Sequence, residues 1–119
     1  MSVTSQYGVL GGKVVADTAA NATGVNNVTG ASGSIFYCEI DNTANSTAIY
    51  LKWYNSASPT IGVTEPNIVF RVGAGESQYF NMPQGIAFGT AFSYACTTAG
   101  GTAGDTSPTH AVSIKAIIS

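Results

Sequence analysis

Hydrophobic and polar residues alternate with a period of two along residues 33–54, interrupted by a polar stretch at 42–47. This period is typical of β-strands with one buried face, and no helical period competes with it. We therefore expect two antiparallel strands that the polar stretch joins into a hairpin. The residues expected on the inward faces of the hairpin are Phe36, Cys38, Ile40, Ile49, Leu51 and Trp53.

The same alternation recurs on both sides of the hairpin. The further strands that it predicts cover residues 13–17, 67–72, 77–82, 90–97 and 110–118. Residues 83–85, Pro-Gln-Gly, are typical of a turn, and a short apolar run with Ile86 and Phe88 follows them. Seven or eight short strands separated by turns predict an all-β chain, folded as a single antiparallel β-sandwich of the immunoglobulin-like or jelly-roll type.

The first thirty residues differ from the rest of the chain. Residues 18–30 are rich in Ala, Asn, Thr and Gly, and they offer only Val25 and Val28 for burial. A polar segment of small residues does not hold itself folded. We therefore divide the chain into an N-terminal arm or edge segment, residues 1–30, and a β-sandwich domain, residues 31–119. An arm would lie against another subunit, whereas an edge segment would lie on its own sandwich.

The chain carries few charges. Charged residues make up 8% of its 119 residues, compared with roughly 25% in a typical globular domain. Weak charge repulsion favours association with a partner or with further copies, although a β domain without any partner fits the same composition. The four basic residues are too few and too scattered to neutralise a run of phosphates, and the net charge is −2, so we expect no nucleic-acid partner. No apolar run is long enough to span a membrane, and no secretory signal is recognisable, so we expect either synthesis in the cytoplasm or the earlier removal of a signal.

The two cysteines and the single tryptophan have a suggestive order. Cys38 lies on the second predicted strand, Trp53 on the third and Cys96 on the sixth, with Tyr94 two positions before Cys96. Immunoglobulin domains have this order, in which two sulfurs face each other across the sandwich and the indole packs on them. Cys38 and Cys96 are candidates for a buried pair, either as a disulfide or as two free thiols, and two unrelated buried thiols explain the same pattern.

The other candidates for chemistry form no recognisable site. His110 is the only histidine, and no cluster of Cys or carboxylates accompanies it to complete a zinc site. Residues 30–33 lack the spacing of a nucleophile elbow, and residues 100–104 lack the lysine of a phosphate-binding loop. We therefore expect a protein that is not an enzyme and that has no catalytic residue, metal or cofactor.

Four side chains on the outward faces of the predicted hairpin form a candidate interface. They are Tyr37, Tyr50, Lys52 and Tyr54. Tyrosine suits an interface because it buries a large area and still tolerates water. Ordinary cross-strand pairing on a solvent-exposed face explains the same pattern.

Three runs of the sequence resemble small structural proteins of tailed bacteriophages. They are YCEIDNTANSTAIYLKWYN at 37–55, GIAFGTAFSYA at 85–95 and TTAGGTAGDTSP at 97–108. The resemblance implies a virion protein that decorates or cements the outer capsid surface, with the major capsid protein as its partner. It also implies a homo-oligomer, with a trimer favoured, that assembles in the host cytoplasm.

The alternative function is a receptor- or glycan-binding module of a tail fibre or adhesin. Its ligand would bind at one end of the sandwich, at the loop 99–108, or at Tyr50 and Tyr54. Similar sandwiches serve in heads, tails and fibres, so the fold by itself does not choose between the two functions.

Overall fold

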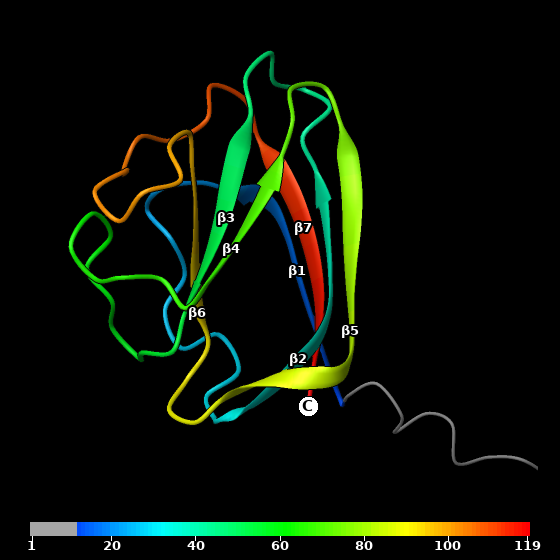
Figure 1. The fold of residues 1–119 in the computed structure, drawn as a ribbon, viewed down its shortest axis with the longest axis vertical. Coiled ribbons are helices and arrows are strands. Elements are labelled where there is room, and N and C mark those ends of the chain that lie inside the picture. Colours follow the sequence, from blue (N-terminus) through cyan, green and yellow to red (C-terminus); the bar gives the residue numbers. More distant parts are fainter. Residues whose placement is uncertain (1–11) are drawn as a thin grey trace, which may run out of the picture.

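The computed structural model describes residues 12–119, which contain seven β-strands and no helix (Figure 1). The strands are β1 (Lys13–Ala20), β2 (Gly33–Asp41), β3 (Ile49–Tyr54), β4 (Ile68–Val72), β5 (Ser77–Phe88), β6 (Ser93–Thr97) and β7 (Val112–Ile118). Four strands form sheet A in the order β1-β7-β2-β5, and three form sheet B in the order β4-β3-β6. All paired strands are antiparallel. The prediction of an all-β antiparallel sandwich is therefore confirmed.

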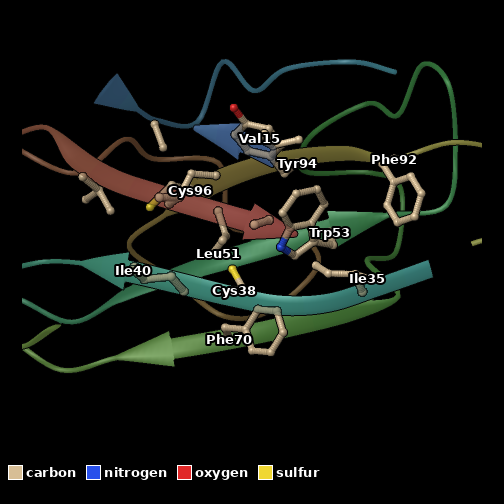
Figure 2. Packing of buried hydrophobic residues seen from close by; sticks show 14 of the residues in the cluster. Val15, Ile35, Cys38, Ile40, Leu51, Trp53, Phe70, Phe92, Tyr94 and Cys96 are labelled. Atoms are coloured by element: carbon tan, nitrogen blue, oxygen red, sulfur yellow. The ribbon is translucent and has the colours of Figure 1, made fainter. Parts of the chain in front are cut away.

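The core lies between the inner faces of the two sheets (Figure 2). Trp53 of β3 packs there against Phe92 and Tyr94, with ring centroids 6.3 Å and 5.0 Å from its own. Trp53, Cys38 and Cys96 have no exposed surface. Because each large apolar side chain contributes about 2 to 3 kcal/mol when it is fully buried, this layer drives the two sheets together.

The expected hairpin within residues 33–54 is wrong. β2 belongs to sheet A and β3 to sheet B, and residues 42–48 cross from one sheet to the other. A period of two shows that each strand has one buried face. It does not show whether successive strands pair with each other or face each other across a core.

Two buried asparagines, Asn42 and Asn45, hold this crossing, and we call them the asparagine clip. Asn45 Nδ2 donates to Asn42 Oδ1 (2.9 Å) and to the carbonyl oxygen of His110 (3.1 Å), while Asn45 Oδ1 accepts from the His110 N–H (2.8 Å). Asn42 Nδ2 donates to the carbonyl oxygens of Thr47 and Gly73, both at 3.0 Å. The clip thus joins the crossing to the β4–β5 turn and to the segment before β7.

β5 also differs from the prediction, because residues 83–85 continue the strand through a sharp bend instead of ending it (Figure 1). The register between β2 and β5 shifts between Ile35 and Tyr37, which marks a bulge. As a result Ile35, and not Phe36, faces the core. Gly85 has a φ of 75°, and a Cβ at Gly85 would lie 2.8 Å from the Phe36 ring, so the glycine belongs to the bulge.

The N-terminal segment is part of the sandwich as far as it is described. β1 is the edge strand of sheet A and pairs with β7. Residues 21–28 then follow β6, where Val25 and Tyr94 exchange two backbone hydrogen bonds of 2.8 and 3.0 Å. Residues 12–30 therefore lie along their own sandwich, and the division of the chain at residue 30 stays a prediction. The remainder of that prediction, residues 1–11, lies outside the described residues.

The position of β7 departs from the immunoglobulin order. In that order the last strand joins the sheet of the third and sixth strands. Here β7 lies between β1 and β2 in sheet A. This position brings Lys115 and Ile117 of β7 next to β2, and both side chains enter the site described below.

Candidate functional site

The outer faces of the two sheets differ in what lies on them. The loops 55–67 and 98–111 gather on the outer side of sheet B (Figure 1), and nearly every residue of β3 and β6 is buried. In sheet A, β2 and β7 instead alternate between buried and more exposed residues. Within residues 12–119, sheet A therefore presents an open outer face, whereas on sheet B only the edge strand β4 keeps exposed outward residues.

Lys52 shows how the outer face of sheet B is covered. Its side chain has no exposed surface, and its Nζ donates to the carbonyl oxygens of Gly101 (2.7 Å) and Gly104 (2.9 Å). Burial lowers the pKa of the Lys52 amine, while the negative charge of Asp105 acts in the opposite direction. The amine thus anchors the loop 98–111 onto β3.

The four residues of the candidate interface do not form one exposed surface. Tyr37 lies on sheet A, whereas Tyr50, Lys52 and Tyr54 lie on sheet B. The expected exposure is wrong for Lys52 and Tyr54, both of which are fully buried, because loops cover β3 on its outer side. Tyr50 is half-buried, and its ring lies 2.9 Å from where a Cβ at Gly100 would stand.

The hydroxyl of Tyr54 is also buried on this side of sheet B. This hydroxyl has no hydrogen-bond partner within residues 12–119, and burial raises the pKa of the phenol. Because the Tyr54 side chain has no exposed surface, it cannot contact a ligand or a neighbouring subunit in this conformation. Among the predicted residues, only Tyr37 and Tyr50 keep exposed surface for such a contact.

The open face of sheet A consists of outward side chains from all four strands. They are Val14, Ala16, Tyr37, Glu39, Tyr79, Asn81, Lys115 and Ile117, and we call this set the open face. Its most exposed large side chains are Val14 (66%) and Tyr79 (65%). An exposed apolar and aromatic surface that spans a whole sheet is typical of an interaction site.

The strand register arranges the open face in rows that run across the sheet. One row is Val14–Ile117–Tyr37–Asn81, and the next is Ala16–Lys115–Glu39–Tyr79, in the strand order β1-β7-β2-β5. The two charges of the second row, Lys115 and Glu39, lie on the two central strands. The flanking positions of the same row hold one small side chain and one large aromatic side chain.

Two tyrosines stack on this face. The rings of Tyr37 and Tyr79 have centroids 6.2 Å apart and planes 25° from parallel. Tyr37 Oη donates to Glu39 Oε2 (2.7 Å), and this bond raises the pKa of the Tyr37 phenol. Tyr79 was absent from the predicted interface, although the alternation along residues 77–82 already places it opposite Phe80 and Met82.

Cys38 and Cys96 are both free and buried, so no disulfide joins them. Burial raises the pKa of each thiol to about 12, which leaves both protonated and unreactive at neutral pH. The Trp53 indole N–H lies close enough to Cys38 to favour the thiolate weakly. It nevertheless makes no hydrogen bond of acceptable geometry within the described range. Of the two alternatives for the pair, the structure shows free thiols.

A hollow with polar side chains lies between β1, the segment 21–25 and Tyr94 of β6. There Tyr94 Oη donates to Asp17 Oδ2 (2.7 Å), and burial, followed by this bond, raises the pKa of the phenol. Asp17 Oδ1 also accepts from the Ala19 N–H (2.9 Å), so both carboxylate oxygens of Asp17 already accept hydrogen bonds within the chain. Among residues 12–119 we find no group of three or more His, Cys, Asp or Glu side chains suited to a metal ion.

The geometry defines a β-sandwich with one covered and one open outer sheet face. No protein-family model, no curated protein and no solved structure matches the chain. Within residues 12–119 no helix is long and apolar enough to cross a membrane.

Proposed function

We propose that this chain is a structural protein of a tailed-phage virion that decorates or cements the outer capsid surface through subunit–subunit contacts. The virion assignment, with the major capsid protein as partner and assembly in the host cytoplasm, comes from the resemblance of residues 37–55, 85–95 and 97–108. The proposed role involves no catalysis. A decoration protein stabilises a shell through many modest contacts, each repeated over the lattice.

The observation that best supports a role in contacts is the open face of sheet A. It offers the apolar side chains Val14 and Ile117 and the stacked rings of Tyr37 and Tyr79, and no loop within residues 12–119 covers them. Aromatic residues are enriched at protein interfaces. A sheet with this outer face fits a protein whose work is to bind other subunits.

The test is to separate particles from the native source on a density gradient and to count copies of this chain per particle. We expect numbers comparable with those of the major capsid protein, and we expect that the purified chain rebinds to particles stripped of it. Absence from virus-sized particles would overturn the proposal. A few copies per particle would instead move the chain to the tail or the fibres.

The second candidate function is a receptor- or glycan-binding module, and the Tyr37–Tyr79 stack is the observation that favours it. Exposed aromatic rings can hold the apolar face of a sugar. Of the locations predicted for this site, Tyr54 is excluded because it is buried, whereas Tyr50 and the loop 99–108 keep exposed surface. If this function holds, a glycan array should show binding that Tyr79→Ala abolishes and that Tyr54→Phe preserves.

A further inference from the structure

We infer that the open face of sheet A binds the same face of a second copy, about a two-fold axis that runs parallel to the strands between β7 and β2. This inference rests on the proposed structural role only in one respect, namely that the chain acts through subunit contacts. It adds the identity of the first partner, which is the chain itself.

The strand order fixes which strands meet in such a pair. In the order β1-β7-β2-β5, the centre of the sheet lies between β7 and β2. A two-fold axis along that centre lays β7 on the partner's β2 and β1 on the partner's β5. A two-fold contact is isologous, so every contact occurs twice.

The central charges are complementary in this arrangement. Lys115 and Glu39 are cross-strand partners in one row, and β7 and β2 are the strands that exchange places. Lys115 therefore faces the partner's Glu39, and Glu39 faces the partner's Lys115. A two-fold axis perpendicular to the strands at this row would instead lay Lys115 on the partner's Lys115. The charges thus favour the axis parallel to the strands.

The sizes of the side chains agree with the same axis. Ala16 and Tyr79 stand at the two ends of the charged row, so the axis lays each Tyr79 over the partner's Ala16. A shallow hollow lies beside Ala16, and its walls include Glu39, Ser113 and Lys115. In the neighbouring row Ile117 faces the partner's Tyr37. Tyr79 and Tyr37 therefore each meet a smaller side chain, while Val14 faces the partner's Asn81.

The size of the face indicates the strength of the contact. Four strands about 4.8 Å apart and about seven residues long give a flat face of roughly 450 Å². A standard interface buries about 800 Å² of accessible surface per partner, so this contact falls among the weak, reversible ones. Repetition on a particle would strengthen such a contact without new residues.

The outer face of sheet B offers no comparable surface for a second copy. Lys52 and Tyr54 are buried, and the carbonyl oxygens of Gly101 and Gly104 already occupy the Lys52 amine. The trimer implied by the resemblance needs a head-to-tail contact and would have to use another surface. The number of subunits in solution therefore distinguishes the face-to-face dimer from the expected trimer.

The experiment is a charge swap, read by sedimentation equilibrium of the purified full chain. We expect the wild-type chain to dimerise reversibly at about 100 μM or below, as a small interface allows. Glu39→Lys leaves two basic residues at the centre of the face, and Lys115→Glu leaves two acidic ones. Each variant alone should dimerise about tenfold more weakly than the wild type. Mixing the two variants should restore dimers, because basic and acidic faces then meet.

Arg71→Glu is the matched control, since Arg71 is exposed on β4 at the edge of sheet B and lies outside the open face. It should leave dimerisation unchanged. Circular dichroism should show that all three variants are folded, and Tyr79→Ser provides a neutral variant that should also weaken the dimer. A wild-type chain that stays monomeric at about 100 μM overturns the inference, as does a dimer or trimer that ignores the charge swap.

The outcome is separable from that of the proposed function. A chain that dimerises through the open face but is absent from particles would retain this inference and remove the virion role. A chain that binds stripped particles as a monomer, with binding lost in Tyr79→Ser, would retain the virion role and assign the open face to the capsid protein.

Discussion

Sheets A and B display the same alternation of apolar and polar residues, yet their outward residues have opposite surroundings. On β3 of sheet B, Lys52 and Tyr54 point outward and are fully buried under loops. On sheet A, Glu39 and Lys115 occupy corresponding outward positions on β2 and β7 and are exposed. An outward position in a strand is therefore not the same as a solvent-exposed position.

The difference has consequences for which residues each face requires. The covered face needs partners inside the chain, such as the carbonyl oxygens that accept from Lys52, and glycines where the loop approaches the sheet. The open face has no such requirement, so its apolar and aromatic side chains are free to meet another molecule. The covered face should therefore respond to substitution with changes in stability, and the open face with changes in association.

The largest expected loss of stability comes from the asparagine clip, which fastens the end of the loop 98–111 through His110. Asn45→Ala removes three hydrogen bonds, and it leaves Asn42 Oδ1 without a partner in a buried place and the His110 N–H without one in a partly buried place. Because each buried polar group left unpaired costs about 1 to 3 kcal/mol, we expect a loss of roughly 3 to 4 kcal/mol in the free energy of unfolding. Urea denaturation measures it. Asn26→Ala, at an exposed position, is the matched control and should change stability by less than about 0.5 kcal/mol.

The outer faces of the two sheets differ in burial, whereas their inner faces should both exclude water. The free energy of unfolding at alkaline pH tests this expectation. Burial raises the pKa of Cys38 on sheet A and of Cys96 on sheet B from 9.0 to about 12. Below pH 9 both thiols are protonated in the folded and the unfolded chain. Between pH 9 and pH 12 only the unfolded chain loses these protons, so the free energy of unfolding falls as the pH rises.

For two such thiols the expected loss between pH 8 and pH 10 is about 3 kcal/mol. Urea denaturation in the presence of a reductant at several pH values measures it. Cys38→Ala with Cys96→Ala should remove this part of the pH dependence. A wild-type chain with unchanged stability up to pH 10 would show that water reaches the thiols.

Much of the architecture could be predicted from the sequence because alternation reports one buried face per strand. The strands at 13–17, 67–72 and 110–118 lie within or close to observed strands, and the inward placement of Cys38 and Cys96 is correct. Alternation carries no information on pairing, so the crossing at 42–48 was interpreted as a hairpin. Nor does it distinguish a turn at 83–85 from a bulge that uses the same glycine.

The candidate site was predicted less well, for a related reason. Tyr37 was placed correctly on an outward face, but Lys52 and Tyr54 were expected to be exposed on the same surface. Their cover comes from the loop 98–111, which is distant in sequence and has no period that would reveal where it packs. Tyr79 could have been found, since the alternation of β5 already places it outward. Its stacking on Tyr37 depends on the pairing of β2 with β5.

A direct comparison of the two faces uses one lysine from each. Lys52→Met keeps the length of the side chain but leaves the carbonyl oxygens of Gly101 and Gly104 without their donor. We expect a loss of about 2 kcal/mol in the free energy of unfolding, partly offset because the buried charge is also removed. The loop 98–111 should in addition become a site of rapid proteolysis.

Lys115→Met makes the same chemical change on the open face. In dilute solution, where the chain is monomeric, it should change the free energy of unfolding by less than about 0.5 kcal/mol. Urea denaturation of both variants measures the difference. Equal losses for the two lysines would show that the faces do not differ as described.

The smallest expected change in the free energy of unfolding comes from the contact between Gly100, in the loop 98–111, and Tyr50 on β3. A Cβ at Gly100 would lie 2.9 Å from the Tyr50 ring, whereas a Cβ at Gly101 would meet nothing within 4 Å. Gly100→Ala should therefore push the loop away from β3 and lower the free energy of unfolding by about 1 kcal/mol, as small overpacking does. Gly101→Ala should be neutral or slightly stabilising, because alanine restricts the unfolded chain. Thermal unfolding of the pair measures the difference, and a Gly100→Ala variant as stable as Gly101→Ala would mean that the loop yields freely and that Tyr50 is only loosely covered.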